Sequence, residues 1–485
     1  MRMSQLLSDL WPYLLGALDL VVSGVASAHA IMYKRDNRSA VGWVGLIWLS
    51  PLLGALLYFS FGINRIRRRS RLLQVSQAWL SEQVYCHPEV ELGPQSELGR
   101  HHPNLDGLAA LIGNLTERPL LKGNAITPLL DGDEAFPAML AAIDQAQQSI
   151  ALCTYIFDTD RAGQAFLEAL ARAVKRGVEV RILIDDVGAR YSRPTIIRRL
   201  RAAGVPTESF LPTRVPRLFH YANLRNHRKI LVVDGQLGFT GGINIREGHW
   251  LAQQPQVPVQ DIHFRVAGPV VSHLQQTFAN DWAFANGECL EGPRWFPPLP
   301  PAGAVMARGI AHGPDEDFER LTLTIVGAVA TANSTVHIVT PYFLPEATLI
   351  AALKVAAMRG VQVHVVLPEH SNIRVMQWAT QAMLWQILER GCHVWRVPAP
   401  FDHSKLFLVD GVWSLFGSTN WDPRSLRLNF EFNVECYDLE LAARLTRLVE
   451  QKIARARPVT FEEVESRSIP IRLRDGTARL WAPYL

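Results

Sequence analysis

The chain has 485 residues with a formal net charge of +4, and 48% of its residues are hydrophobic against 19% charged. This composition excludes a disordered or fibrous chain, and its length suggests about three structural units. The small positive charge gives no case for nucleic-acid binding. The five cysteines are isolated, without a C-x-x-C pair, which argues against a disulfide framework, a zinc ribbon or an iron–sulfur site.

Two long apolar segments of equal length open the chain. Trp11–Met32 contains Asp19 as its single charged residue, and Val41–Gly62 contains none. At about 1.5 Å per helical residue, each would reach ~33 Å and cross a hydrocarbon core of ~30 Å. We therefore predict a hairpin of two membrane spans. A cleaved signal peptide and a buried helical hairpin are the alternatives, but the uncharged second segment argues against the latter.

Five arginines follow the second apolar segment, within residues 65–71. By the positive-inside rule, this basic collar places both ends of the hairpin, and the rest of the chain, in the cytoplasm. We expect residues 1–72 to form the membrane hairpin with its collar. Residues 73–120 show little periodicity and are predicted to be a linker.

The remaining sequence contains an internal repeat. From about residue 135, and again from about residue 317, it reads as helix, strand, helix, strand. The tetrad Arg176–Glu179 (RGVE) recurs as Arg359–Gln362 (RGVQ). The predicted fold class is therefore α/β, with two duplicated domains at residues 121–300 and 301–485 that are related by a pseudo-two-fold axis. Such an axis places equivalent groups from both halves at the seam.

Each half carries one copy of the pattern H-x-K-x4-D-G. Every member of the first copy is separated from its counterpart in the second by the same distance, and an asparagine follows each histidine at the same spacing. The residues are His227, Lys229, Asp234 and Asn244 in the first half, and His403, Lys405, Asp410 and Asn420 in the second. Histidine and lysine two positions apart on a strand point to the same face. Two facing halves would therefore bring together two imidazoles, two ammonium groups and two carboxamides.

This set of side chains suits a phosphodiester. Lysines and amides can neutralise the non-bridging oxygens without a metal, while one histidine attacks phosphorus and the other protonates the leaving alkoxide. A nucleophilic histidine needs a carboxylate on its other ring nitrogen. Asp261, which follows His227 in the chain, and Glu431, which follows His403, are the candidates. Asp234 and Asp410 belong to the motif but precede turn glycines, so a structural role is the alternative to a chemical one.

With these motifs, the chain resembles the phospholipase D superfamily, and more closely the bacterial cardiolipin synthases with two spans. The resemblance includes Tyr58–Gly62, Asp261-x-His263, Gly417-Ser418-x-Asn420-x-Asp422 and Leu428–Glu431. It implies that a histidine attacks phosphatidylglycerol, that glycerol leaves, and that a second phosphatidylglycerol takes the phosphatidyl group to give cardiolipin. It also implies that no cofactor is needed and that the protein lies in the bacterial inner membrane.

By the same resemblance, His227 is the nucleophile and His403 the acid. Asn244, Asn420 and Ser418 are expected to bind substrate. One departure is visible, because the first half has Gly242 where the second has Ser418. The open alternatives are a membrane-bound phospholipase D, a transfer to serine or ethanolamine, a nuclease, and a non-catalytic membrane scaffold. The membrane hairpin and the low charge argue against the nuclease.

Overall fold

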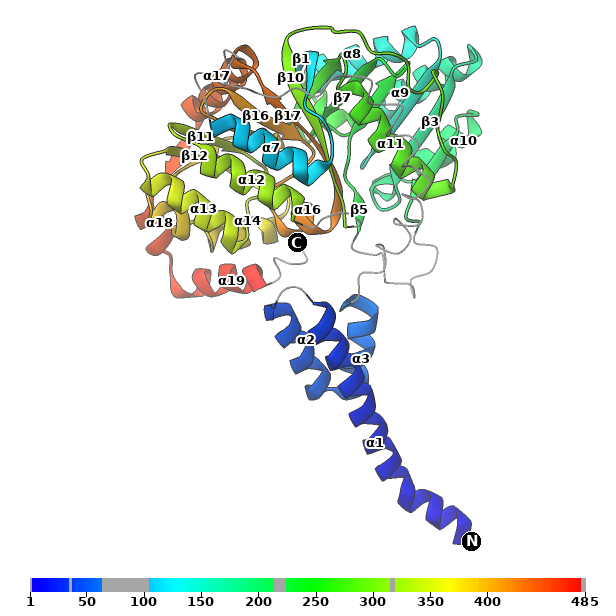
Figure 1. Cartoon of the computed structure of the whole chain (residues 1–485), viewed down its shortest axis with the longest axis vertical. Coiled ribbons are helices and arrows are strands. Elements are labelled where there is room, and N and C mark those ends of the chain that lie inside the picture. Colours follow the sequence, from blue (N-terminus) through cyan, green and yellow to red (C-terminus); the bar gives the residue numbers. More distant parts are fainter. Residues whose placement is uncertain (1, 35–36, 63–103, 213–223, 315–318, 481–485) are drawn as a thin grey trace. The chain divides into compact units, whose positions relative to one another are not determined.

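The computed structural model describes residues 2–34, 37–62, 104–212, 224–314 and 319–480. The chain divides into two compact units, an N-terminal helical unit and a large α/β unit (Figure 1). The predicted basic collar at residues 65–71 and most of the predicted linker lie outside the described residues.

The helical unit begins with α1, which runs over Arg2–Tyr33. Its segment Tyr13–Tyr33 is long and apolar enough to cross a membrane, as expected for the first span. The second apolar segment forms three short pieces instead of one long helix. These are α2 (Asn37–Leu49), α3 (Pro51–Leu57) and a short π-helix, η1 (Tyr58–Gly62).

The structure therefore does not confirm a second continuous span. The break falls at Ser50, whose φ of −146° and ψ of 78° are not helical. A residue before proline is pushed out of the helical region by the proline ring, and here Pro51 follows Ser50. At 1.5 Å per residue, the 13 residues of α2 reach only about 20 Å, which is too short to cross a bilayer core.

Helix α3 turns back along α2 and toward the C-terminal end of α1. Gly54 packs so tightly on α2 that an added Cβ would lie 2.8 Å from Cα of Ile47. The ring of Tyr58 lies 5.5 Å from that of Trp43 in α2, and its hydroxyl is 2.7 Å from Nδ1 of His29 in α1. The segment thus begins and ends near the same end of α1.

The α/β unit contains the predicted repeat, built on a 16-stranded sheet in its described part. The strands of the first half are β1 (Leu121–Leu130), β2 (Ser149–Thr154), β3 (Glu179–Asp185), β4 (Thr207–Phe210), β6 (Ile230–Val233), β7 (Leu237–Gly241) and β9 (Ile262–Ala267). Those of the second are β10 (Val305–His312), β11 (Thr335–Val339), β12 (Gln362–Pro368), β13 (His393–Val397), β15 (Leu406–Val409), β16 (Trp413–Gly417), β17 (Asn429–Tyr437) and β18 (Arg457–Val459). Antiparallel pairing of β1 with β10 joins the halves into one sheet.

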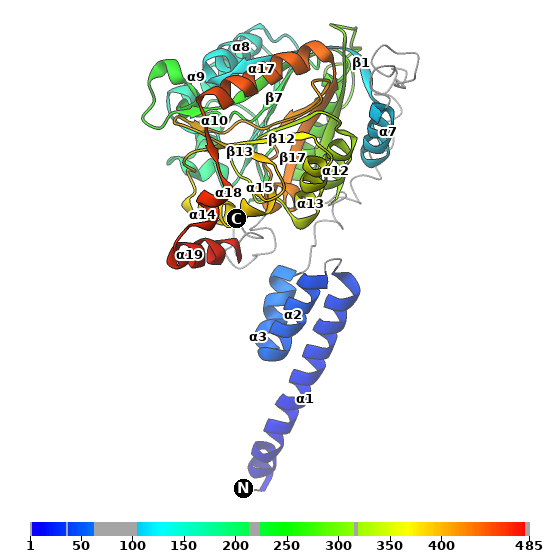
Figure 2. The same ribbon diagram turned by 90° about the vertical axis from the view of Figure 1, so that its left-hand side faces the viewer.

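Helices cover the sheet in both halves (Figures 1 and 2). The first half has α8 (Asp131–Gln145), α9 (Arg161–Lys175), α10 (Ile196–Ala202) and α11 (Val271–Asn286). The second has α12 (Arg320–Thr331), α13 (Ala347–Met358), α14 (Arg374–Gln381), α15 (Trp385–Leu388), α16 (Pro423–Arg427), α17 (Leu439–Arg455), α18 (Phe461–Glu465) and α19 (Ile469–Leu480). Each half has its own hydrophobic core.

The last part of the predicted linker belongs to the α/β unit. Residues Asn104–Thr116 form helix α7, whose Leu105, Leu108 and Ile112 are buried. They pack in the core of the second half, together with residues of α12 such as Ile325. The linker prediction is therefore wrong for this stretch, whose apolar residues at i, i+3 and i+7 are typical of a half-buried helix.

Candidate active site

Two short strands, each directly before a motif histidine, lie at the seam between the two halves. Strand β5 (Arg225–Asn226) pairs in parallel with β17, and β14 (Phe401–Asp402) pairs in parallel with β8 (Val259–Gln260). Each pairing crosses from one half to the other. The backbone N–H of His227 donates to the carbonyl of Phe430 at 2.9 Å, and that of His403 to the carbonyl of Gln260 at 2.7 Å. The two halves are thus joined at the residues that precede each motif.

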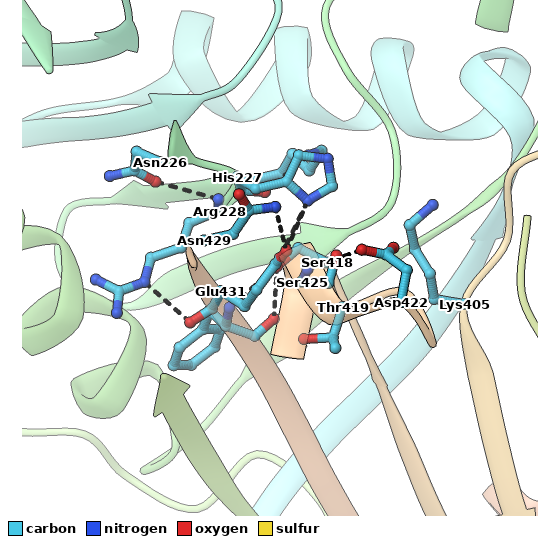
Figure 3. Close-up of polar contacts among 12 residues, drawn as sticks. Asn226, His227, Arg228, Lys405, Ser418, Thr419, Asp422, Ser425, Asn429 and Glu431 are labelled. Atoms are coloured by element: carbon cyan, nitrogen blue, oxygen red, sulfur yellow. Dashed lines mark hydrogen bonds and ion pairs between the residues drawn. The ribbon is translucent and has the colours of Figure 1, made fainter. Parts of the chain in front are cut away.

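His227 is oriented by Glu431 of the second half (Figure 3). Its Nδ1 lies 3.1 Å from both carboxylate oxygens. The hydroxyl of Ser418 and the amide of Asn429, which lies 3.1 Å away, donate to the same carboxylate. Burial by itself raises the pKa of Glu431, but the interaction with His227, the charge of Lys229 and the hydrogen bond from Ser418 outweigh it, so the net pKa is lowered.

His403 is oriented by Asp261 of the first half, with Nδ1 and Oδ2 2.7 Å apart. Oδ1 of this aspartate accepts a hydrogen bond from the N–H of Ile262 at 2.8 Å. Gly242 makes room for it, since a Cβ there would collide with the carboxylate. The predicted carboxylates therefore do contact the motif histidines, but each contacts the histidine of the opposite half. Spacing along the sequence could not show this exchange.

Both imidazoles are held in the tautomer in which Nδ1 carries the proton and Nε2 has a free lone pair. A carboxylate at Nδ1 keeps the ring proton on that nitrogen. Burial lowers the pKa of His227, and lowers that of His403 well below its usual value. Both shifts favour the neutral form of the rings. An anionic ligand would add negative charge and raise both pKa values again.

The motif lysines lie beside the histidines. Nζ of Lys229 donates to the carbonyl of His227 at 2.7 Å, and Lys405 bonds to the carbonyl of His403 in the same way. Burial lowers the pKa of Lys229 to about 7 and that of Lys405 to about 8, although nearby carboxylates oppose both shifts. The charge of Lys405 lowers the pKa of Lys229 further. Two buried ammonium groups that repel each other are arranged to receive an anion.

The three predicted substrate-binding residues differ in what they contact. Oδ1 of Asn244 accepts from the N–H of Ile156 at 3.2 Å, which fixes its amide. Oδ1 of Asn420 is buried and has no partner within the described residues. The hydroxyl of Ser418 donates to Glu431, so in this structure it orients a carboxylate. Its substrate-binding role stays a prediction.

The motif aspartates do not reach the histidines. The carboxylate of Asp234 accepts from the N–H groups of residues 147–149 at 2.7–3.1 Å. That of Asp410 accepts from the N–H groups of residues 333–335 at 2.8–2.9 Å. Both side chains lie at the turn that ends the strand after the motif histidine, with φ of 52° at each aspartate. These contacts favour the structural interpretation of the two aspartates, and their assignment as catalytic groups stays a prediction.

Three aromatic side chains near the histidines have no role predicted from the sequence. The ring centroid of Tyr155 is 5.2 Å from that of His227, and that of Tyr342 is 6.3 Å from that of His403. Both tyrosines occur in the sequence repeat, which is a usable signal. His249, in a 3₁₀ turn at Glu247–His249, is buried 6.2 Å from His403, and burial lowers its pKa to about 3. It lies outside both motifs, so no sequence signal indicated it.

Comparisons with known proteins match this site and its scaffold. The profile of the PLD-like domain of cardiolipin synthases matches residues 139–282 and 325–453, and a phospholipase D-nuclease N-terminal profile matches residues 21–62. Cardiolipin synthase A of Pseudomonas putida is 32% identical over 98% of both chains. The major cardiolipin synthase ClsA of Bacillus subtilis is 30% identical over 93% of this chain and 95% of its own.

One solved structure supports the fold. Phosphatidylserine synthase of Haemophilus influenzae superposes with a TM-score of 0.62 at 16% identity, and covers 78% of this chain and 100% of its own. At this identity the likeness concerns the fold alone.

Proposed function

The chain belongs to the cardiolipin synthase family with PLD-like domains, and we propose that it transfers a phosphatidyl group between two phosphatidylglycerol molecules. The products are cardiolipin and glycerol. The reaction class follows from the relatives, which are cardiolipin synthases matched over nearly their full length.

The observation that carries the proposal is the crossed pair of carboxylate–imidazole contacts. Glu431 contacts His227 and Asp261 contacts His403. Each contact favours a neutral ring whose Nε2 has a free lone pair. Two buried lysines accompany them. A single hydrolytic base would need one such pair, whereas a covalent double displacement needs a nucleophile and a separate proton carrier.

In the first step, Nε2 of His227 attacks the phosphorus of phosphatidylglycerol. A P–N bond forms and the bond from phosphorus to the glycerol oxygen breaks. His403, protonated once the phosphodiester has raised its pKa, gives its proton to the leaving alkoxide, and glycerol departs. Lys229 and Lys405 neutralise the non-bridging oxygens.

In the second step, the same groups work in reverse. The hydroxyl of a second phosphatidylglycerol loses its proton to His403 and attacks the phosphatidyl-histidine. A P–O bond forms, the P–N bond breaks, and cardiolipin leaves with His227 restored. Because either alcohol can accept the phosphatidyl group, glycerol should drive the reaction backward. Lysine ammonium groups take the electrostatic role in this scheme, so we expect turnover to persist in EDTA.

We place the protein in the bacterial inner membrane with the α/β unit in the cytoplasm. The apolar segment of α1 and the arginines at residues 65–71 support this placement. Since α2 and α3 are each too short to cross, α1 would be the one full span among the described helices. The N-terminal end of α1 would then face the periplasm.

The placement can be tested with an impermeant maleimide on intact cells. A cysteine at Ser4→Cys should react from outside, whereas Cys289, which is exposed in the α/β unit, should react only after lysis. Protection of both sites in intact cells would restore the arrangement with two full spans.

The activity is tested with labelled phosphatidylglycerol and purified protein in a bilayer. We expect cardiolipin and free glycerol in about equal amounts, with phosphatidic acid as a minor product. Phosphatidic acid as the main product, with no reversal by glycerol, would show a membrane-bound phospholipase D. Absence of any product would favour a non-catalytic scaffold.

A further inference from the structure

Helix α19 carries apolar residues on two faces. One face packs inward, where Asp475 and Ala478 are buried and Ala478 joins a small core with residues of α14. The other face presents Ile469, Leu473 and Leu480 to solvent, with 73%, 65% and 74% of their surfaces exposed. Three aliphatic side chains that are more than half exposed along one helix are unusual for a soluble surface.

The three residues form a stripe along one side of α19. They are spaced at i, i+4 and i+11, which brings them to one side of a helix with 3.6 residues per turn. The intervening position i+7 is Gly476, where an added Cβ would meet nothing within 4 Å. The stripe therefore runs the length of α19 and faces open space.

Arginines flank this stripe. Arg472 and Arg479 are exposed and lie at i and i+7 on one side of it, with Arg472 3.7 Å from Glu465. On the other side, the guanidinium of Arg474 lies 4.7 Å from the ring centre of Trp378 in α14. An exposed apolar stripe bordered by arginines is typical of a helix that lies in the plane of a membrane surface.

A groove rich in arginine lies between α19, α14 and the neighbouring strand ends. It has a volume of about 470 Å³. Five arginines line it, against the carboxylates of Glu369 and Asp475 (Arg374, Arg396, Arg457, Arg467 and Arg474).

The ion pairs in this groove leave positive charge in excess. Arg457 pairs with Glu369, and with Glu463 from outside the groove. Arg467 and Arg474 share Asp475. Arg374 has no carboxylate partner in the described part of the chain. Anionic headgroups would complement this excess.

We propose that α19 is an interfacial membrane helix, which inserts its apolar stripe among the lipids of an anionic phospholipid bilayer and seats an anionic headgroup in the adjoining arginine groove. This contact is separate from α1 and would hold the α/β unit at the lipid surface from which its substrate comes.

The surface fits a bilayer better than a second copy of the chain. Three aliphatic side chains offer on the order of 400 Å², about half of the ~800 Å² per partner that a stable protein interface buries. Two copies would also bring like charges together, because each stripe is bordered by its own arginines. A bilayer with anionic headgroups avoids both difficulties.

The experiment uses the full chain in lipid nanodiscs with a phosphatidylglycerol that carries a photoreactive group on its acyl chain. After irradiation, labelled peptides are identified by mass spectrometry. We expect label on residues 469–480, at least fivefold stronger in discs with phosphatidylglycerol than in discs of phosphatidylcholine carrying the same trace of probe. The readout needs no turnover, so it stands or fails independently of the proposed activity.

Two variants sharpen the test. Leu473→Gln with Leu480→Gln should remove most of the label from 469–480 and raise the apparent KM severalfold without changing kcat. Leu439→Gln is the matched control, since Leu439 is an exposed leucine on α17, outside the stripe, and should change neither. Equal labelling in both lipids would overturn the headgroup part of the proposal. No label on 469–480, or crosslinks from it to another protein chain, would overturn the whole.

Discussion

The two halves of the α/β unit share one scaffold but hold their histidines differently. In the first half, Gly242 leaves room for Asp261, which reaches His403 across the seam. At the equivalent place in the second half, Ser418 donates to Glu431, the carboxylate that reaches His227. The longer glutamate is fixed by a hydroxyl, and the shorter aspartate by close backbone contact. Pseudo-symmetry therefore preserves the position of the carboxylate, while different contacts hold it in each half.

The halves also differ in the ion pairs that surround the residues next to each motif histidine. Asn226 and Asp402 occupy equivalent positions, and each accepts a hydrogen bond from the backbone N–H two residues later, at 3.1 Å and 3.0 Å. The first half then adds an ion pair between Arg228 and Asp281, whereas the second pairs Asp402 itself with Lys452. In each half a buried charged residue of the motif strand is paired, Arg228 with an acidic partner and Asp402 with a basic one. The fold therefore requires the local turn but not one particular ion pair.

Loss of either histidine should have the largest effect and would show whether the halves have separate tasks. His227→Ala and His403→Ala should each reduce cardiolipin formation by about 10³-fold or more, and the double variant should be little worse.

A substrate with an activated leaving group separates the two roles, because it needs no acid. His403→Ala should then still form a covalent phosphatidyl adduct, detected by mass spectrometry, and His227→Ala should not. The opposite result would exchange the assignments of nucleophile and acid.

The crossed carboxylates come next. Glu431→Gln and Asp261→Asn should each lower kcat by about 10²- to 10⁴-fold, since an amide holds the wrong tautomer of its histidine. Asp144→Asn, which affects an exposed carboxylate paired with Arg172, is the control and should be neutral. If Glu431→Gln blocked proton transfer and Asp261→Asn blocked adduct formation, the assignment of Glu431 to the nucleophile and of Asp261 to the acid would be wrong.

Exchange of the glycine and the serine tests how each half holds its carboxylate. Gly242→Ser should lower kcat by about 10²-fold, because its Cβ would displace Asp261 from its place beside His403. Ser418→Gly removes only one of the donors to Glu431 and should cost about tenfold. Circular dichroism of both variants checks that the fold persists, and equal effects on kcat would contradict this account.

The pH profile of kcat/KM distinguishes the two lysine environments. Activity should fall as pH rises through about 7 to 8, because Lys229 and then Lys405 lose their protons. At low pH, activity should fall only below 6.5, where the neutral His227 becomes protonated. Glu431 raises the pKa of Lys229, so Glu431→Gln should move the alkaline limb to lower pH. An unchanged alkaline limb in this variant would exclude Lys229 as its source.

The turn aspartates should have the smallest effect on activity. Asp234→Asn and Asp410→Asn should each leave kcat within about twofold. Each should lower the free energy of unfolding by roughly 1–3 kcal/mol, as expected when charged hydrogen bonds to backbone N–H groups are weakened. Chemical denaturation and a turnover assay measure both quantities, and a loss of kcat at unchanged stability would restore a chemical role.

The repeat, the paired motifs and the candidate carboxylates could all be predicted from the sequence. These are local or periodic features: the alternation of helix and strand patterns, the two-residue spacing of histidine and lysine on a strand, and the constant offset that relates His227 to His403 and each motif residue to its counterpart. The first apolar helix was equally evident, because hydrophobicity and length are properties of one segment.

Which carboxylate contacts which histidine could be seen only in the folded chain. Glu431 contacts His227, and Asp261 contacts His403, because strands β5 and β14 each pair across the seam, and long-range pairing leaves no mark in sequence spacing. Asp234 and Asp410 proved to bind turn amides because the strand after each histidine carries them to its far end. The break at Ser50 had a local cause in the following proline, but the return of α3 onto α2 depended on packing between helices, which hydropathy does not record.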